Sequence, residues 1–149
     1  MGKREKVVAI YIRTNNKDVE STHSIINQLS NINYYLQKNN INGNREYYID
    51  AGYSGNNLER PEFNRLIKNI ENQKVDLIVA DKLSVIGRNI NFMGFIDFLE
   101  QHKINLISVR EEYNLNKFLQ ERPKMMKMMD EWYKTDLSAR KRQRKNNIR

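Results

Sequence analysis

A run of six apolar residues near the start of the chain, Val7 to Ile12, limits the folds that this sequence can adopt. The run is rich in β-branched residues and shows no alternation of apolar and polar side chains. A strand with one face in water alternates in this way, whereas a strand covered on both faces does not. The run therefore predicts a central strand of a sheet that has helices on both sides.

The following segments alternate between helix-like and strand-like patterns. Ser24–Lys38 and Asn91–His102 carry apolar residues three and four positions apart, the spacing of one helical face. Pro61 suits the first turn of a further helix, which runs through Ile70. Further strands are predicted at residues 46–50, 76–80 and 105–109. This order predicts an α/β fold with a mainly parallel sheet of four to five strands and helices on both faces.

The last part of the chain has a different character. Phe118–Lys145 is predicted to be one long helix that contains Pro123, a methionine-rich stretch and a basic end. A small sheet cannot cover the whole apolar face of such a helix. We therefore expect a domain at residues 1–117 and, at residues 118–149, a helix that leaves it. The methionines suit a self-complementary interface, so a homodimer or higher oligomer is expected.

The charge of the chain indicates a polyanionic partner. Lys and Arg number 26 against 18 Asp and Glu, a formal net charge of +8. Six cations and no acid lie in the last eleven residues, so this segment carries most of the excess. Cations that continue an amphipathic helix favour contacts to DNA phosphates, with a merely solubilising end as the alternative. The predicted DNA-binding residues are Arg140, Lys141, Arg142, Arg144 and Lys145.

Several classes of protein are disfavoured by composition. The chain has no cysteine, and His23 and His102 are its two histidines, which argues against disulfides and an ordinary zinc site. We expect no metal and no cofactor. The apolar runs are too short to cross a bilayer, and no basic-then-apolar leader opens the chain. A cytoplasmic protein without membrane contact is expected.

Three arginines lie at predicted strand ends or loops: Arg13 ends the first strand, Arg60 follows a glycine-containing loop, and Arg88 follows the strand at 76–80. A guanidinium makes two parallel hydrogen bonds to a phosphate, so several at one point would form a phosphodiester pocket. An ion pair of Arg13 with Asp50 or Asp81 is the alternative. The residues that follow Arg13 include no serine, cysteine or histidine; they are Thr14, Asn15 and Asn16.

Four short motifs follow one another: Ile-Tyr-Ile-Arg at 10–13, Tyr-Ile-Asp-Ala-Gly-Tyr-Ser-Gly at 48–55, Glu-Arg-Pro at 59–61 and Leu-Ser-Val-Ile-Gly-Arg-Asn at 83–89. In this order and spacing they resemble the catalytic domain of serine site-specific recombinases, a family that spans resolvases, DNA invertases and large serine integrases or transposases. The likeness extends from about residue 5 to about residue 145, and no single motif carries it. It implies that the long helix forms the dimer interface and then crosses the DNA minor groove.

The resemblance also implies a reaction. In that family a serine hydroxyl attacks the scissile phosphodiester and forms a 5′ phosphoserine linkage without a metal, while arginines stabilise charge on the phosphorus. Asn15 stands at the position of the nucleophile, and Val85 stands where the family has the first of two arginines. The remaining positions that match the family's catalytic residues are Arg13, Gln28, Arg60 and Arg88.

These departures favour a serine-recombinase-type DNA recombination domain that is impaired or inactive in cleavage. An amide cannot be activated by losing a proton near neutral pH, and losing a catalytic hydroxyl costs orders of magnitude in rate. Ser54 and Ser84 match positions of the pattern that are not nucleophilic. The alternatives are an active recombinase that uses Thr14, and a regulatory paralogue that dimerises with an active recombinase or inhibits it.

Overall fold

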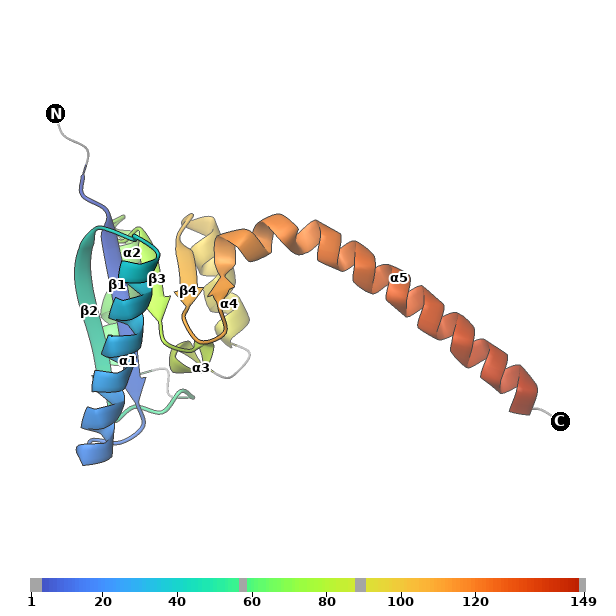
Figure 1. Ribbon diagram of the computed structural model, residues 1–149, viewed down its shortest axis with the longest axis horizontal. Helices are drawn as coiled ribbons and strands as arrows, with labels where there is room; N and C mark the ends of the chain where they lie inside the picture. Colours follow the sequence, from blue (N-terminus) through green and yellow to red (C-terminus); the bar gives the residue numbers. More distant parts are fainter. Residues whose placement is uncertain (1–3, 57–58, 88–90, 148–149) are drawn as a thin grey trace. The chain divides into compact units, whose positions relative to one another are not determined.

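The computed structural model describes residues 4–56, 59–87 and 91–147. Within these residues, five strands form one sheet in the order β2-β1-β3-β4-β5 (Figure 1). The strands are β1 (Val7–Thr14), β2 (Asn44–Ala51), β3 (Leu77–Ala80), β4 (Asn105–Ser108) and β5 (Tyr113–Asn114), of which β5 alone is antiparallel to its neighbour. The helices are α1 (Val19–Lys38), α2 (Pro61–Glu71), α3 (Leu83–Ile86), α4 (Asn91–Gln101) and α5 (Leu115–Asn147). The predicted fold class is confirmed.

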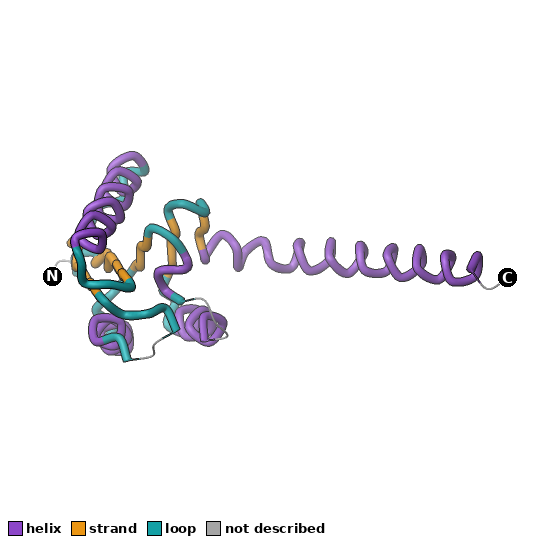
Figure 2. The backbone as a smooth tube through the Cα atoms, turned by 90° about the horizontal axis from the view of Figure 1, so that it is seen from below, coloured by secondary structure: helices purple, strands orange, loops and turns teal. Residues whose placement is uncertain are grey.

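β1 is the central strand that its apolar run predicted. All eight of its residues are buried, because β1 lies between β2 and β3 and has helices over both faces. Val8, Ile10 and Ile12 share one core cluster with residues of α1. On the other face, Tyr11 meets Phe63 of α2, with ring centroids 5.3 Å apart. Figure 2 shows this division, with α1 on one side of the sheet and α2 and α4 on the other.

α1 begins at Val19, earlier than the predicted start at Ser24. Its start is set by a capping residue rather than by an apolar stripe: the Asp18 carboxylate accepts a hydrogen bond from the backbone N–H of Ser21 at 2.9 Å. Such a cap satisfies one of the donors that the first turn leaves unpaired. The polar first turn hid the start from a prediction based on apolar spacing.

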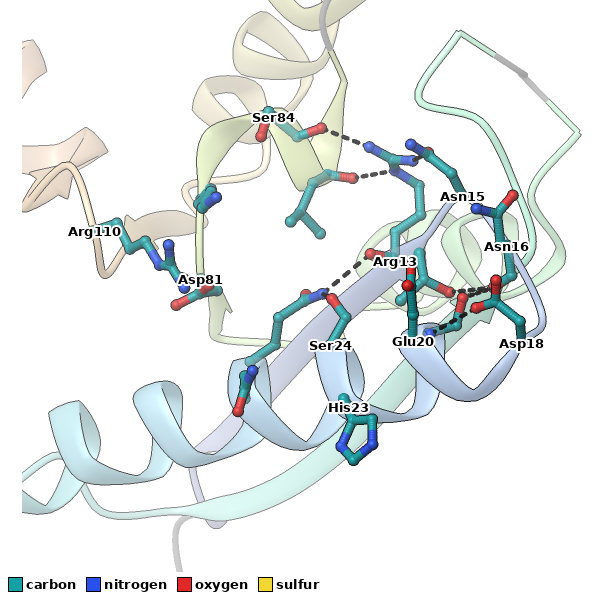
Figure 3. Close-up of a pocket in the computed structure, with 16 residues that line it drawn as sticks. Arg13, Asn15, Asn16, Asp18, Glu20, His23, Ser24, Asp81, Ser84 and Arg110 are labelled. Atoms are coloured by element: carbon teal, nitrogen blue, oxygen red, sulfur yellow. Dashed lines mark hydrogen bonds and ion pairs between the residues drawn. The ribbon is translucent and has the colours of Figure 1, made fainter.

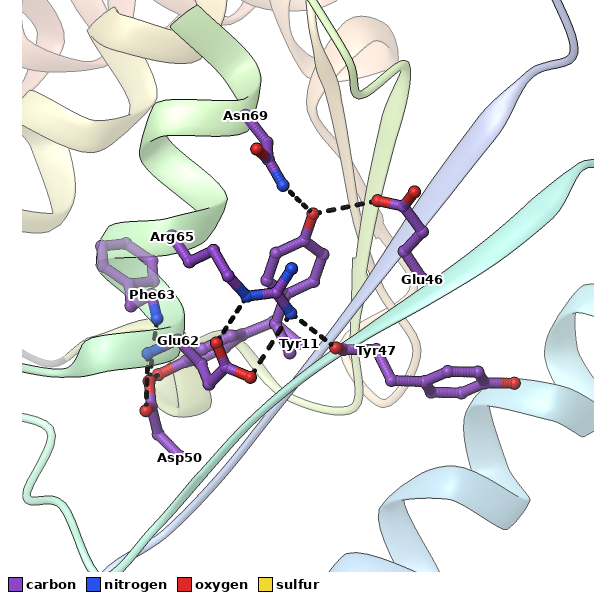
Figure 4. Close-up of polar contacts among 9 residues, drawn as sticks. Tyr11, Glu46, Tyr47, Asp50, Glu62, Phe63, Arg65 and Asn69 are labelled. Carbon is purple, nitrogen blue, oxygen red and sulfur yellow. Dashed lines mark hydrogen bonds and ion pairs between the residues drawn. The ribbon is translucent and has the colours of Figure 1, made fainter. Parts of the chain in front are cut away.

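α2 begins at Pro61, as the proline predicted, but its first turn is capped from another element. Asp50 of β2 accepts hydrogen bonds from the backbone N–H groups of Glu62 and Phe63, each at 2.9 Å. The same carboxylate accepts from the Tyr11 hydroxyl at 2.8 Å. One buried carboxylate therefore joins β1, β2 and α2 (Figure 4).

The sequence pattern did not predict α3 or β5. α3 has four residues and β5 has two, which is too short for a periodic pattern. The backbone N–H of Leu83, at the start of α3, lies 3.3 Å from each carboxylate oxygen of Glu111. Ser108 donates a hydrogen bond to the same carboxylate. The turn between β4 and β5 therefore holds α3.

α5 is a helix of 33 residues that continues through Pro123 and begins at Leu115 rather than at the predicted Phe118. The chain divides into two compact units, residues 1–115 and residues 116–149. Among the described residues, no helix is long and apolar enough to cross a membrane. The apolar side chains of α5 that are more than half exposed include Met126, Met128, Met129, Trp132 and Tyr133.

The loop after β2 comes very close to Arg13 at the end of β1. A Cβ atom built on Gly55 would lie 2.9 Å from Nη2 of Arg13, which is closer than such contacts normally come. The guanidinium is held by backbone carbonyls and cannot move away without losing hydrogen bonds. Glycine is therefore required at position 55 by close approach.

We expect Gly55→Ala to lower the free energy of unfolding by about 1–3 kcal/mol, because the new methyl group displaces a hydrogen-bonded guanidinium. Gly94→Ala is the matched control: its Cβ would meet nothing within 4 Å, and alanine is favoured over glycine within a helix by about 1 kcal/mol. Urea unfolding of both variants measures the difference. Equal stability of the two variants would contradict the close contact.

Candidate active site

A cleft of about 510 Å³ lies at the carboxyl ends of β1 and β3 (Figure 3). Its walls come from the end of β1, the first turns of α1 and the segment that carries α3. The strand order reverses between these two neighbouring strands, because the chain passes from β1 out to β2 and then back to β3. Ligand sites in open α/β sheets occur at such points.

Arg13 occupies one wall of the cleft, and its side chain is engaged by protein oxygens. Nε donates to the carbonyl of Val85 at 2.9 Å, and Nη2 donates to the carbonyl of Ser84 at 2.8 Å. Nη1 donates to the carbonyl of Tyr53 at 2.9 Å and to Oδ1 of Asn15 at 2.6 Å. The guanidinium thus fastens the loop after β2 and α3 to the end of β1.

Arg60 lies close to the same point. Its Nη1 donates to the Val85 carbonyl at 3.3 Å and to the Tyr11 hydroxyl at 3.2 Å. The guanidinium carbon also lies 4.2 Å from the centre of the Phe63 ring, a cation–π distance. Its buried Nε has no hydrogen-bond partner among the described residues. The structure therefore brings Arg13 and Arg60 together at one carbonyl oxygen, while Arg88 lies outside the described residues.

Asn15, at the expected nucleophile position, is exposed at the cleft, and its side chain contacts Arg13. Because a guanidinium only donates hydrogen bonds, the amide oxygen of Asn15 must be the atom that points to Nη1. The neighbouring Thr14 is buried, and its hydroxyl donates to the backbone carbonyl of Asn16 at 3.0 Å. Both residues line the cleft, and a nucleophilic role for Thr14 stays a prediction.

Gln28 also lines the cleft, but it holds the backbone and not the guanidinium of Arg13. Its Nε2 donates to the Arg13 carbonyl at 3.2 Å and to the Ser24 hydroxyl at 3.1 Å. Its buried Oε1 has no hydrogen-bond partner among the described residues. Gln28 therefore fixes the end of β1 from α1.

Val85 contributes its backbone to the site. Its carbonyl accepts from both Arg13 and Arg60, and its side chain is buried with 7% exposure. The side chain supplies no charge to the cleft, where the resemblance implies a guanidinium. Among the described residues, Arg13 and Arg60 are the cations at the Val85 carbonyl, and Lys82 and Arg110 also line the cleft.

Two buried acids near the cleft, Asp81 and Asp50, have partners of their own. Asp81, whose side chain is 2% exposed, accepts from Arg110 at 3.0 Å and from Asn31 at 3.1 Å. Asp50 binds the first turn of α2 and Tyr11. Burial raises the pKa of the Tyr11 phenol far above its usual value, partly opposed by Arg60, so the hydroxyl stays protonated and donates to Asp50. Within the described part of the chain, no group of three His, Cys, Asp or Glu side chains could hold a metal ion.

The predicted DNA-binding cations lie on α5 and form a separate set. Arg140, Lys141 and Arg142 are exposed, and Arg140 pairs with Asp136 one helical turn earlier at 3.1 Å. The side chains of Arg144 and Lys145 are not among those that the structure describes.

Sequence reasoning missed the backbone carbonyls that hold Arg13, because backbone acceptors leave no residue-type signal. Gly55, next to Arg13, was the one local clue.

Several solved structures have a similar fold. The structure is similar to the N-terminal catalytic domain of TP901-1 integrase, at 28% identity over 89% of this chain and 99% of that chain, with a TM-score of 0.71. It shares the fold of a resolvase family site-specific recombinase from Streptococcus pneumoniae, at 20% identity over 90% of this chain and 99% of that chain, with a TM-score of 0.60. It also shares the fold of the C-terminal catalytic domain of ISC1926 TnpA, an IS607-like serine recombinase, at 17% identity over 69% of this chain and 68% of that chain, with a TM-score of 0.61.

No curated protein sequence matches the chain. The family model described as the resolvase N-terminal domain matches residues 8–149, which is nearly the whole chain. The match agrees with the parallel sheet, the long last helix and the likeness to serine recombinase catalytic domains. The chain therefore belongs to the resolvase family of serine recombinase catalytic domains.

Proposed function

We propose that the protein is a DNA recombination domain that binds DNA and associates with a second copy but does not cleave the phosphodiester. The observation that carries this proposal is the pair of replacements at the cleft. Asn15 offers an amide at the nucleophile position, and Val85 places a buried apolar side chain where a second guanidinium is expected. The proposal is also supported by the contacts of Arg13, Arg60 and Gln28 near the end of β1: Gln28 holds the Arg13 carbonyl, and Arg60 shares the Val85 carbonyl with Arg13.

The chemistry supports loss of cleavage rather than loss of fold. A phosphoserine linkage needs an oxygen nucleophile that can lose its proton, and a carboxamide nitrogen or oxygen does not meet that need. Charge on the phosphorus also has to be stabilised by donors fixed in advance. With Val85 in place of arginine, fewer such donors reach the cleft.

Cleavage is tested by trapping the covalent intermediate. With supercoiled DNA that carries a candidate site, we expect no protein–DNA adduct from the wild-type chain. Asn15→Ser alone should recover at most a small part of the activity, about 10³-fold below a competent site, since removing one of several cooperating groups can cost as much as removing all. Asn15→Ser combined with Val85→Arg supplies both missing groups, and an active family member serves as the positive control.

Two outcomes would contradict this proposal. An adduct from the wild-type chain that disappears in Thr14→Val would identify Thr14 as the nucleophile and the protein as an active recombinase. Full recovery by Asn15→Ser alone would show that the guanidinium missing at Val85 is not required.

The basic end of α5 is proposed to track DNA phosphates. Arg140, Lys141 and Arg142 support this role, because all three are exposed and lie close together on one helix. Such contacts are sequence-independent and depend on salt, since each one releases a counterion. We propose that the protein binds DNA in the cytoplasm and needs no metal or cofactor to do so.

Replacing Arg140, Lys141 and Arg142 by glutamine should lower the slope of log affinity against log salt by about 0.9 for each phosphate that the helix no longer neutralises. The control removes the same charge elsewhere, by glutamine at the exposed lysines Lys68, Lys74 and Lys103. Fluorescence anisotropy with a short duplex measures both slopes. Equal slopes for the two triple variants would remove α5 from DNA binding.

A regulatory paralogue that pairs with an active recombinase is the second candidate. The exposed apolar face of α5 favours it, because Met126, Met129 and Trp132 are each more than 60% exposed in the single chain. Apolar area of this kind marks an association surface. Either a second copy or a related recombinase would cover it.

Sedimentation of the chain alone and mixed with an active relative separates these partners. We expect a homodimer that Trp132→Ala weakens by about tenfold or more, because a large aromatic side chain dominates such interfaces. Lys134→Ala, at an exposed side chain of the same helix, is the control. Preferred mixed dimers would favour the regulatory candidate, and a strict monomer would contradict both forms of association.

A further inference from the structure

The Asn15 side chain does more in the structure than leave out a hydroxyl. Its Oδ1 accepts a hydrogen bond from Nη1 of Arg13 at 2.6 Å. Backbone carbonyls of Tyr53, Ser84 and Val85 accept from the same guanidinium. Asn15 therefore supplies a side-chain acceptor to an arginine whose carbonyl contacts are part of the fold.

The acceptor lies about as far from Nη1 as an oxygen of a phosphate bound by a guanidinium would. Charge-assisted hydrogen bonds from a guanidinium to an anionic oxygen are about 2.7–2.9 Å long, close to the observed contact. Arg13 and Asn15 both line the cleft of about 510 Å³, so their hydrogen bond lies at its wall (Figure 3). The backbone carbonyls cannot be removed by substitution, whereas the amide can.

The length of the side chain matters. In asparagine the oxygen is carried on Cγ, whereas the hydroxyl of serine is carried on Cβ, one bond closer to the backbone. A serine at position 15 would thus withdraw the oxygen from its place beside Nη1. Asparagine both removes the nucleophile and extends an acceptor to the arginine.

We propose that Asn15 is an internal ligand of Arg13 that competes with phosphate and keeps the cleft in an anion-free state. This inference rests on the proposed function, because it treats the end of β1 as a phosphodiester pocket. It goes beyond loss of cleavage, since it concerns how strongly the pocket holds a phosphate group. Asn15 is then a positioning residue that acts through Arg13.

The test is a titration of the full chain with inorganic phosphate, followed by nuclear magnetic resonance of the Arg13 Nε–H signal, which is assigned with Arg13→Lys. Asn15→Ala removes the acceptor, and we expect phosphate to bind at least about tenfold more tightly, the effect of one hydrogen bond to a charged group. Asn15→Asp keeps an acceptor in place and adds a negative charge, so phosphate affinity should fall below that of the wild-type chain.

Asn16→Ala is the matched control, because Asn16 is the adjacent asparagine at the same cleft and its contacts to Thr14 and Ser21 use its backbone carbonyl. It should bind phosphate as the wild-type chain does. Asn15→Ser is a second variant that withdraws the acceptor, and thermal unfolding confirms that each variant is folded. If Asn15→Ala fails to fold, Asn15→Ser decides the test.

Unchanged phosphate affinity in the folded Asn15→Ala or Asn15→Ser variant would overturn the inference. Tighter binding that leaves the Arg13 signal unmoved would overturn it as well, because phosphate would then bind elsewhere. These outcomes are distinct from failure of the proposed function. A covalent DNA adduct from the wild-type chain would refute that function, whereas unchanged phosphate affinity refutes only the role of Asn15.

Discussion

The buried guanidinium of Arg13 is the interaction on which this end of the fold depends. A charge with 7% exposure is costly unless every side of it is hydrogen-bonded. The chain meets that cost with carbonyls from the loop after β2 and from α3, so the same contacts that satisfy the charge also fix two loops against β1. Arg60 adds a second guanidinium at the Val85 carbonyl, and its stacking on Phe63 ties that point to α2.

Much of the fold could be predicted from the sequence because its main signals are local. The unalternating run of β1 indicated a strand covered on both faces, and helical spacing indicated α1, α2 and α4. Three features could not be predicted, since short or polar elements carry no apolar periodicity: the start of α1 at a polar turn, the four-residue α3 and the two-residue β5. The cap that Asp50 provides to α2 was equally hidden, because it comes from another strand.

The side chains of the site could be predicted from the sequence, but the backbone oxygens that accept their hydrogen bonds could not. Arg13 and Arg60 were singled out from their positions after a strand and a loop, and the structure brings them to one atom. The acceptors at that atom are backbone oxygens, whose placement depends on the path of α3 and not on residue type. Gln28 was placed by resemblance alone, and the structure shows that its amide holds the carbonyl of residue 13.

The Glu111 carboxylate lies at the first backbone N–H of α3 and also accepts from Ser108. The carbonyls of α3 that hold Arg13 are thereby fixed from a turn that does not itself touch the guanidinium. Replacement of Glu111 would weaken the hydrogen bonds of Arg13 indirectly, because the peptide groups of α3 that accept them would shift. Glu111, which does not line the cleft, is thus a remote determinant of the arginine's orientation, and its replacement would alter the cleft without changing any cleft-lining side chain.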